Sequence, residues 1–76
     1  MGVQAYILIQ VQTGKAQTLK KEISQYSWAL RVDRIMGPFD IVALVEAENN
    51  REIGDTILCD IHSLQGVKRT LTCPVI

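Results

Sequence analysis

The sequence has no excess of charge of either sign: 8 Lys and Arg residues balance 8 Asp and Glu residues, for a formal net charge of +0. A balanced chain lacks the electrostatic attraction that draws proteins to nucleic acids or to anionic membrane surfaces. The short basic stripe of Lys15, Lys20 and Lys21 is interrupted by Glu22 and is typical of a solvated helix face. We therefore expect no direct nucleic-acid binding and no membrane binding.

Long apolar runs and paired cysteines are also lacking. The run YILI at residues 6–9 is far too short to span a bilayer, and no basic segment followed by a long apolar run opens the chain. Cys59 and Cys73 have no CxxC spacing, and two thiols in an otherwise unstapled chain indicate a reducing compartment. We expect a cytoplasmic protein.

What the chain does contain is enough apolar residues for one small domain. Its 76 residues are 47% hydrophobic and show no internal repeat, linker or low-complexity tract. A single core of this size is only marginally stable, and a chain this short has difficulty hiding so much apolar surface. An oligomer is therefore expected.

Hydrophobic periodicity predicts the order strand, helix, strand, strand, helix, strand. The expected strands cover residues 3–12, 30–36, 39–47 and 67–73, and Gly37-Pro38 marks a hairpin between the middle two. Thr13 is expected to cap the first helix, while Asn49 and Glu52 form a capping box that opens the second. Gly66 is expected to end the second helix. The predicted buried stripes of the helices are Ala16, Leu19, Ile23, Tyr26 and Ile53, Ile57, Ile61, Leu64.

This element order predicts an α+β fold, the ferredoxin-like βαββαβ sandwich, with a four-stranded antiparallel sheet and two helices on one face. Alternation predicts that Ala5, Ile7, Ile9, Ile41, Ala43 and Val45 face the helices. The other face then carries Tyr6, Leu8, Val42 and Leu44, where a solvated sheet would carry polar side chains. Contiguous apolar surface usually marks an interface, so we expect a face-to-face sheet dimer. The alternative is a monomer in which long flanking side chains shield these residues.

Several chemistries lack the residues that they require. The first loop has no CxxC for a copper chaperone and no arginine-bearing, glycine-rich loop for an acylphosphatase, and the open face offers only Tyr6 for base stacking. Asp55, Cys59 and His62 line one side of a helix without a fourth ligand, so no metal site is expected. Neither cysteine has an activating base, and no carboxylates are paired, so no enzyme and no cofactor are expected.

Two segments, residues 36–40 and 68–72, together carry the groups that an α-amino acid requires. Gly37 exposes backbone amides that can hold a carboxylate, and Asp40 can pair with an ammonium group. The hydroxyls of Thr70 and Thr72 can donate or accept hydrogen bonds. The alternative interpretation is a hairpin turn whose aspartate stabilises its own backbone, with threonines chosen for strand propensity.

Three stretches of the chain resemble a known family: AYILIQVQTGK at residues 5–15, MGPFDIVALVEAEN at 36–49 and SLQGVKRTLTCPVI at 63–76. They are similar to the ligand-binding domain of the Lrp/AsnC transcription regulators, the module for regulation of amino acid metabolism. The resemblance implies a dimer formed through the sheets, dimers that assemble into a ring, and an amino-acid effector bound at the contact between dimers. It implies these ligand-binding residues: Gly37, Pro38, Phe39, Asp40, Thr70 and Thr72.

The resemblance also shows two departures. Pro38 stands where the family often has an acidic or small residue, and proline removes one amide donor from the loop. The 76 residues leave no space for the helix-turn-helix domain of the regulators, so we expect residues 1–76 to form a single ligand-binding domain without a DNA-binding domain. Such a stand-alone member is expected to sense amino acids and either to co-assemble with full-length regulators or to regulate by another route. The alternative is that the chain is part of a longer regulator.

Two other functions stay open at this stage. A dimeric α/β-barrel enzyme of the small monooxygenase or isomerase type needs a cavity between sheet and helices lined by a histidine or a carboxylate. A purely structural oligomerisation domain would leave the cleft between dimers vacant.

Overall fold

A computed structural model describes residues 2–76. The chain forms β1 (Val3–Val11), α1 (Ala16–Ser24), β2 (Ala29–Arg34) and β3 (Ile41–Ala47). It continues through one helical stretch made of α2 (Asn50–Glu52), the π-helical turn η1 (Ile53–Ile57) and α3 (Leu58–His62), and it closes with β4 (Val67–Pro74). The predicted order βαββαβ is confirmed.

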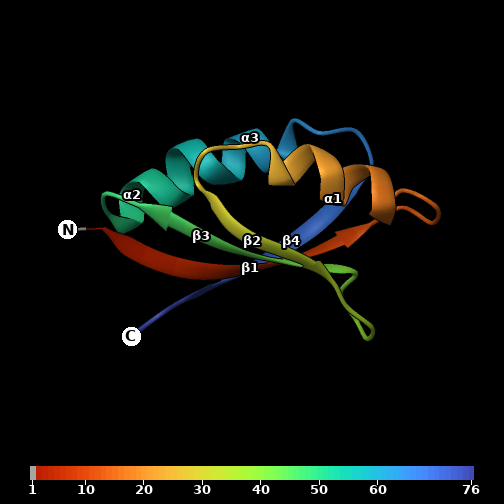
Figure 1. Cartoon of the computed structure of the whole chain (residues 1–76), viewed down its shortest axis with the longest axis horizontal. Helices are drawn as coiled ribbons and strands as arrows, with labels where there is room; N and C mark the ends of the chain where they lie inside the picture. Colours follow the sequence, from red (N-terminus) through yellow and green to blue (C-terminus); the bar gives the residue numbers. More distant parts are fainter. Residues whose placement is uncertain (1) are drawn as a thin grey trace.

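The four strands form one sheet in the order β2-β3-β1-β4, and every neighbouring pair is antiparallel. The helices lie together over one face of this sheet, and the other face is uncovered (Figure 1). This is the ferredoxin-like fold that the sequence predicts. No helix within residues 2–76 has the length and apolar character needed to cross a membrane.

The core lies between the sheet and the helices and consists of aliphatic side chains. Residues facing each other on β1 and β3, such as Ile7 and Ala43 or Ile9 and Ile41, are fully buried, as the alternation predicts. Leu19 and Ile23 of α1 and the isoleucines of the second helical stretch cover them. Burial of each isoleucine contributes roughly 1.5–3 kcal/mol, which makes this layer the main source of stability.

The two loops next to the helices differ from the prediction. Thr13 does not cap α1, because Gly14 adopts a positive φ of 85° and turns the chain, so the helix begins after Lys15 instead. Gly66 does not end the second helical stretch, which ends at His62 with Ser63 as its C-cap. Gly66 has a φ of 105° and forms the turn into β4, where its carbonyl accepts a hydrogen bond from the Gln12 amide.

The second helical stretch begins as predicted and then widens. The Asn49 side chain accepts a hydrogen bond from the Glu52 amide at 2.8 Å, which confirms that half of the capping box. Over Ile53–Ile57 the helix makes a π turn, and the Leu58 amide bonds back to the Ile53 carbonyl. The prediction of one regular α-helix was wrong at this turn. Ile53, Ile57 and Ile61 all remain buried, so the wider turn keeps the apolar stripe on the sheet.

The hairpin between β2 and β3 is longer than predicted, because both strands stop short of Gly37-Pro38. The Ile35 amide donates to the Asp40 carbonyl at 2.9 Å and closes the loop that lies between these residues. Gly37 adopts a φ of 129°, a conformation that favours glycine. The loop projects from one end of the sheet, away from the helices (Figure 1).

Candidate functional site

Asp40 fastens the hairpin loop to the end of β1. Its backbone amide donates to the Ile9 carbonyl at 2.9 Å, and its Oδ2 accepts a hydrogen bond from the Val11 amide at 2.9 Å. The bond to Val11 is partly buried. The aspartate therefore stabilises the backbone next to it, while the remaining acceptor capacity of the carboxylate stays available to another donor.

Two side chains outside the predicted site hold the same loop. The Arg69 guanidinium lies over the Phe39 ring, with Cζ 5.3 Å from the ring centroid. The Gln10 Nε2 donates to the Pro38 carbonyl at 3.4 Å. Gln10 and Arg69 are paired on β1 and β4, so both lie on the open side of the sheet. In the sequence, Arg69 was indicated by its position beside the predicted Thr70, within the stretch 63–76 that carries the family resemblance.

Thr70 and Thr72 face the opposite side of the sheet. They pair with Ile9 and Ile7, whose side chains are buried toward the helices. The Thr70 Oγ1 lies 3.1 Å from the Nε2 of His62, the last residue of α3. His62 is exposed and bonds to a residue of the predicted ligand site.

The six predicted ligand residues thus form two groups within one chain. The hairpin group joins residues 37–40 to Gln10 and Arg69, and the threonine group consists of Thr70, which bonds to His62, and Thr72 on the same side of β4. The two groups are presented on different sides of β4, because successive residues of a strand point to opposite faces. A ligand that contacts both groups therefore has to reach both sides of the edge strand β4.

The uncovered sheet face is apolar at its centre. Tyr6 is 47% exposed, and Leu8, Val42 and Leu44 are half-buried beside it. Leu71 of β4 is paired with Leu8, is 49% exposed, and extends this surface. We call Tyr6, Leu8, Val42, Leu44 and Leu71 the open sheet face.

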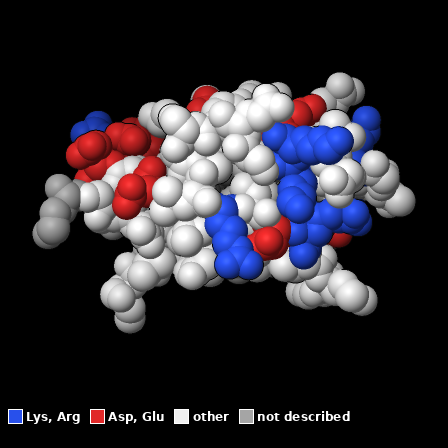
Figure 2. Space-filling view, in the orientation of Figure 1, with Lys and Arg blue, Asp and Glu red and all other residues white. Residues whose placement is uncertain are grey.

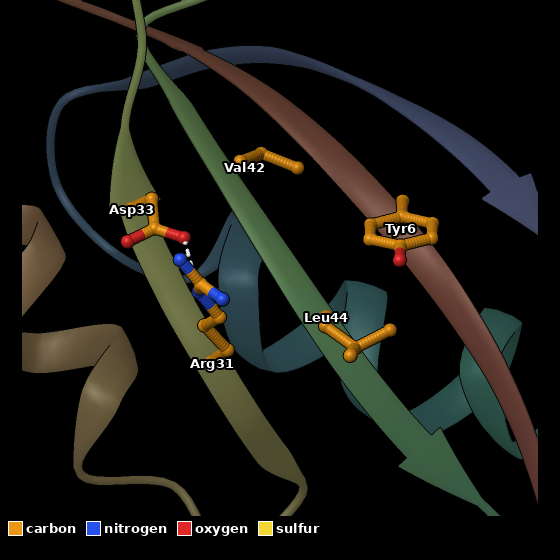
Figure 3. A pocket seen from close by; sticks show the side chains of 5 residues that line it. All are labelled: Tyr6, Arg31, Asp33, Val42 and Leu44. Carbon is orange, nitrogen blue, oxygen red and sulfur yellow. Dashed lines mark hydrogen bonds and ion pairs between the residues drawn. The ribbon is translucent and has the colours of Figure 1, made fainter.

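A hollow of about 180 Å³ lies on the open sheet face toward β2. Figure 3 shows its lining: Tyr6 of β1, Val42 and Leu44 of β3, and Arg31 and Asp33 of β2. The Arg31 Nε and the Asp33 Oδ2 are 2.7 Å apart and form an ion pair at the edge of the hollow. The surface is therefore an apolar centre with a charged border, which is the usual anatomy of a protein interface.

A second hollow, of about 370 Å³, lies on the helical side and is lined by Glu22, Gln25, Tyr26 and Leu64. The Tyr26 ring, which lines this hollow, stacks on Trp28 with the ring centroids 4.7 Å apart, and the Trp28 Nε1 donates to Asp60 at 3.2 Å. Lys and Arg side chains gather at the end of the molecule where α1 and the hairpin lie, and a cluster of Asp and Glu side chains lies at the other end, near α2 (Figure 2). The charged side chains are therefore unevenly distributed along the molecule, although the formal net charge is +0.

The described residues 2–76 form neither a metal-binding cluster nor a buried polar site. Asp55 pairs with Arg51 at 3.4 Å, and His62 bonds to Thr70. Within residues 2–76 no three His, Cys, Asp or Glu side chains gather into a set that could hold a metal. Across that same part of the chain no polar or charged side chain is buried, so the space between sheet and helices holds no titratable group.

Comparison with known proteins gives one family. The model of the Lrp/AsnC ligand binding domain matches residues 4–76. No curated protein is similar enough to match the chain.

Solved structures share the whole fold. The protein TTHA0845 from Thermus thermophilus is 32% identical, with 97% of this chain and 92% of that chain covered and a TM-score of 0.90. AsnC from E. coli is 13% identical over 97% of this chain, with a TM-score of 0.88. The transcriptional regulator NMB0573 from Neisseria meningitidis, solved as a complex with L-Met, is 15% identical over 97% of this chain, with a TM-score of 0.74. The match covers 50% of AsnC and 49% of NMB0573, so this chain spans about half the length of these two proteins.

Proposed function

Because the chain belongs to the Lrp/AsnC ligand-binding domain family, we propose that it binds an amino-acid effector between subunits and so modulates transcription regulation. The role is non-enzymatic, and the ligand biases the assembly that binds it better. A single domain that acts in the cytoplasm, without a DNA-binding domain of its own within residues 1–76, is part of this proposal.

The observation that carries the proposal is the division of the predicted ligand residues into two groups. Asp40 lies with the hairpin group, while Thr70 and Thr72 point to the other side of β4. A neighbouring subunit that brings its own threonine group to the hairpin group completes a polar site that one chain leaves divided. This arrangement supports ligand binding at the contact between dimers.

The chemistry of the divided site fits an α-amino acid. The Asp40 carboxylate attracts an ammonium group, and the Thr70 and Thr72 hydroxyls donate and accept hydrogen bonds. Gly37 keeps the loop backbone open to a ligand, although Pro38 supplies no amide hydrogen. The Neisseria regulator NMB0573 carries L-Met, and we propose that this chain takes an effector of the same class.

The assembly begins, in this proposal, with a dimer formed through the open sheet face. Apolar residues at the centre of two strands gain by leaving water, at about 25 cal/mol per Å² of buried surface. Such dimers then assemble into a ring, which brings the hairpin loops of one dimer against its neighbour. AsnC from E. coli shares the fold, and full-length Lrp/AsnC regulators are in this proposal candidate partners for co-assembly.

Light scattering combined with a thermal-shift screen tests the function. The pure protein is measured alone and with each of the twenty amino acids. A ligand at about 100 times its Kd stabilises the native state by about 2.7 kcal/mol, so an effector raises the melting temperature. A rise with one amino acid, together with a mass of a dimer or more, is expected. A monomer that no amino acid stabilises would contradict the proposal.

One second function has an observation in its favour. The Asp40 carboxylate and the Thr70 hydroxyl already have partners within the chain, in the Val11 amide and His62. A purely structural oligomerisation domain needs nothing more from these residues. An assembly of constant mass and constant melting temperature across the twenty amino acids supports that alternative.

A further inference from the structure

Arg69 is held in place by an aromatic ring at the hairpin end of the sheet. It extends from β4, on the open side, and reaches Phe39 in the loop between β2 and β3, with Cζ 5.3 Å from the ring centroid. Contact with a ring narrows the orientations of a guanidinium and so of its planar fork of N–H donors. An oriented guanidinium is well suited to bind a carboxylate through two parallel hydrogen bonds.

The positive charge of Arg69 has no carboxylate partner in the described chain. The ion pairs within residues 2–76 join Arg31 to Asp33 and Arg51 to Asp55. Arg69 contacts the ring of Phe39 instead, and the nearest acid along the loop, Asp40, bonds to the Val11 amide. Phe39 therefore contacts the Arg69 cation and is followed in the chain by the Asp40 carboxylate, and these two charges form no ion pair with each other.

A cation and a carboxylate at the same end of the sheet that do not pair with each other suit a zwitterionic ligand. An α-amino acid carries an ammonium and a carboxylate on the same carbon, and each charged end gains most from a partner of opposite sign. Because Pro38 has no amide hydrogen, the loop offers the carboxylate of such a ligand one hydrogen-bond donor fewer than a loop with another residue at this position. A cationic side chain beside the loop supplies the missing donor.

We propose that Arg69 binds the carboxylate of the amino-acid effector, while Asp40 of the same subunit binds its ammonium group. The inference rests on the proposed function and adds to it a residue that determines specificity. Phe39 acts as a positioning residue, because it orients the guanidinium. The site consequently selects ligands that carry a free carboxylate and discriminates against the corresponding amides.

Calorimetry on the full chain tests this inference, with the amino acid that raises the melting temperature and with its α-carboxamide as probes. Wild-type protein is expected to bind the acid at least about tenfold more tightly than the amide. Arg69→Gln is expected to lose that discrimination because acid binding weakens and amide binding does not. Lys68→Gln, a change of the same kind at the neighbouring exposed residue, is the matched control and is expected to behave as wild type.

Arg69→Lys provides a second measurement that holds if Arg69→Gln does not fold. Lysine keeps the charge but loses the planar fork, so the preference for the acid is expected to fall and not to vanish. Unchanged discrimination in either variant overturns the role of Arg69 and leaves amino-acid binding intact. A wild-type protein that binds none of the twenty amino acids overturns both proposals.

Discussion

The carboxylate of Asp40 accepts a hydrogen bond from the backbone amide of Val11, with 2.9 Å between Oδ2 and the nitrogen. The Asp40 amide also donates to the Ile9 carbonyl at 2.9 Å. The residue assigned to the ligand's ammonium group therefore also fixes the hairpin loop to the end of β1. Binding and folding are coupled at this position, so a test of either has to separate the two.

Two variants, Asp40→Ala and Asp40→Asn, separate the role of Asp40 in folding from its proposed role in ligand binding. Alanine leaves the partly buried Val11 amide without its acceptor, which is expected to cost about 1.5 kcal/mol. In a domain of this size that loss lowers the melting temperature by roughly 6–12 °C. Asparagine keeps an acceptor oxygen and removes the charge, so it is expected to melt near wild type while effector affinity falls at least about tenfold. Calorimetry and thermal melts measure both quantities. Wild-type affinity in Asp40→Asn would rule out the proposed contact with the ammonium group.

Introducing a charged side chain into the open sheet face is expected to weaken the proposed dimer. Leu8→Asp and Leu44→Asp each place a carboxylate at the centre of the apolar surface, and burial of an unpaired charge is costly. The dimer dissociation constant is expected to rise at least about tenfold, equivalent to about 1.4 kcal/mol. Thr18→Asp, on the exposed side of α1, adds the same charge away from the sheet and is the control. Light scattering over a dilution series measures the effect, and two variants that stay as dimeric as the control would exclude this interface.

Alanine substitution is expected to change stability in opposite directions at two glycines that lie in different environments. Gly66 has a φ of 105°, and an added Cβ would lie 3.2 Å from the Lys15 Cγ and 3.3 Å from the Leu19 Cδ1. Gly66→Ala is therefore expected to cost about 1–3 kcal/mol through backbone strain. Gly54, in the η1 turn, has nothing within 4 Å of such a Cβ, and Gly54→Ala is expected to stabilise the protein by roughly 0.5–1 kcal/mol. Urea denaturation measures both, and equal effects would contradict the difference between the two sites.

The strands and the core could be predicted from sequence because burial follows a simple period. Ala5, Ile7 and Ile9 alternate with larger or polar residues, and all three are fully buried. The π turn was missed because Ile53, Ile57 and Ile61 keep the spacing of an α-helix in sequence even where the backbone widens. The cap at Thr13 failed because Gly14 makes a turn that side-chain preference alone does not reveal.

Contacts between distant side chains were beyond sequence reasoning. Arg69 meets Phe39 only because β4 and β3 lie on either side of β1, and the length of both side chains lets them meet across it. The bond between His62 and Thr70 likewise depends on where α3 ends relative to the edge strand. The residues of the predicted ligand site were indicated by resemblance, but their division between two sides of β4 required the pairing register.

The division of the predicted ligand residues between two sides of β4 allows a test of whether one ligand is bound by two subunits. Asp40→Asn removes the charge of the hairpin group, and Thr70→Val removes a hydroxyl of the threonine group while keeping a β-branched residue suited to a strand. Each variant alone is expected to bind the effector at least about tenfold more weakly than wild type. When the two are unfolded, mixed in equal amounts and refolded, about one site in four between subunits receives a native hairpin group and a native threonine group. Calorimetry is therefore expected to recover that fraction of high-affinity sites in the mixture. If each ligand is bound by a single chain, no subunit in the mixture carries both native groups, and no high-affinity sites return.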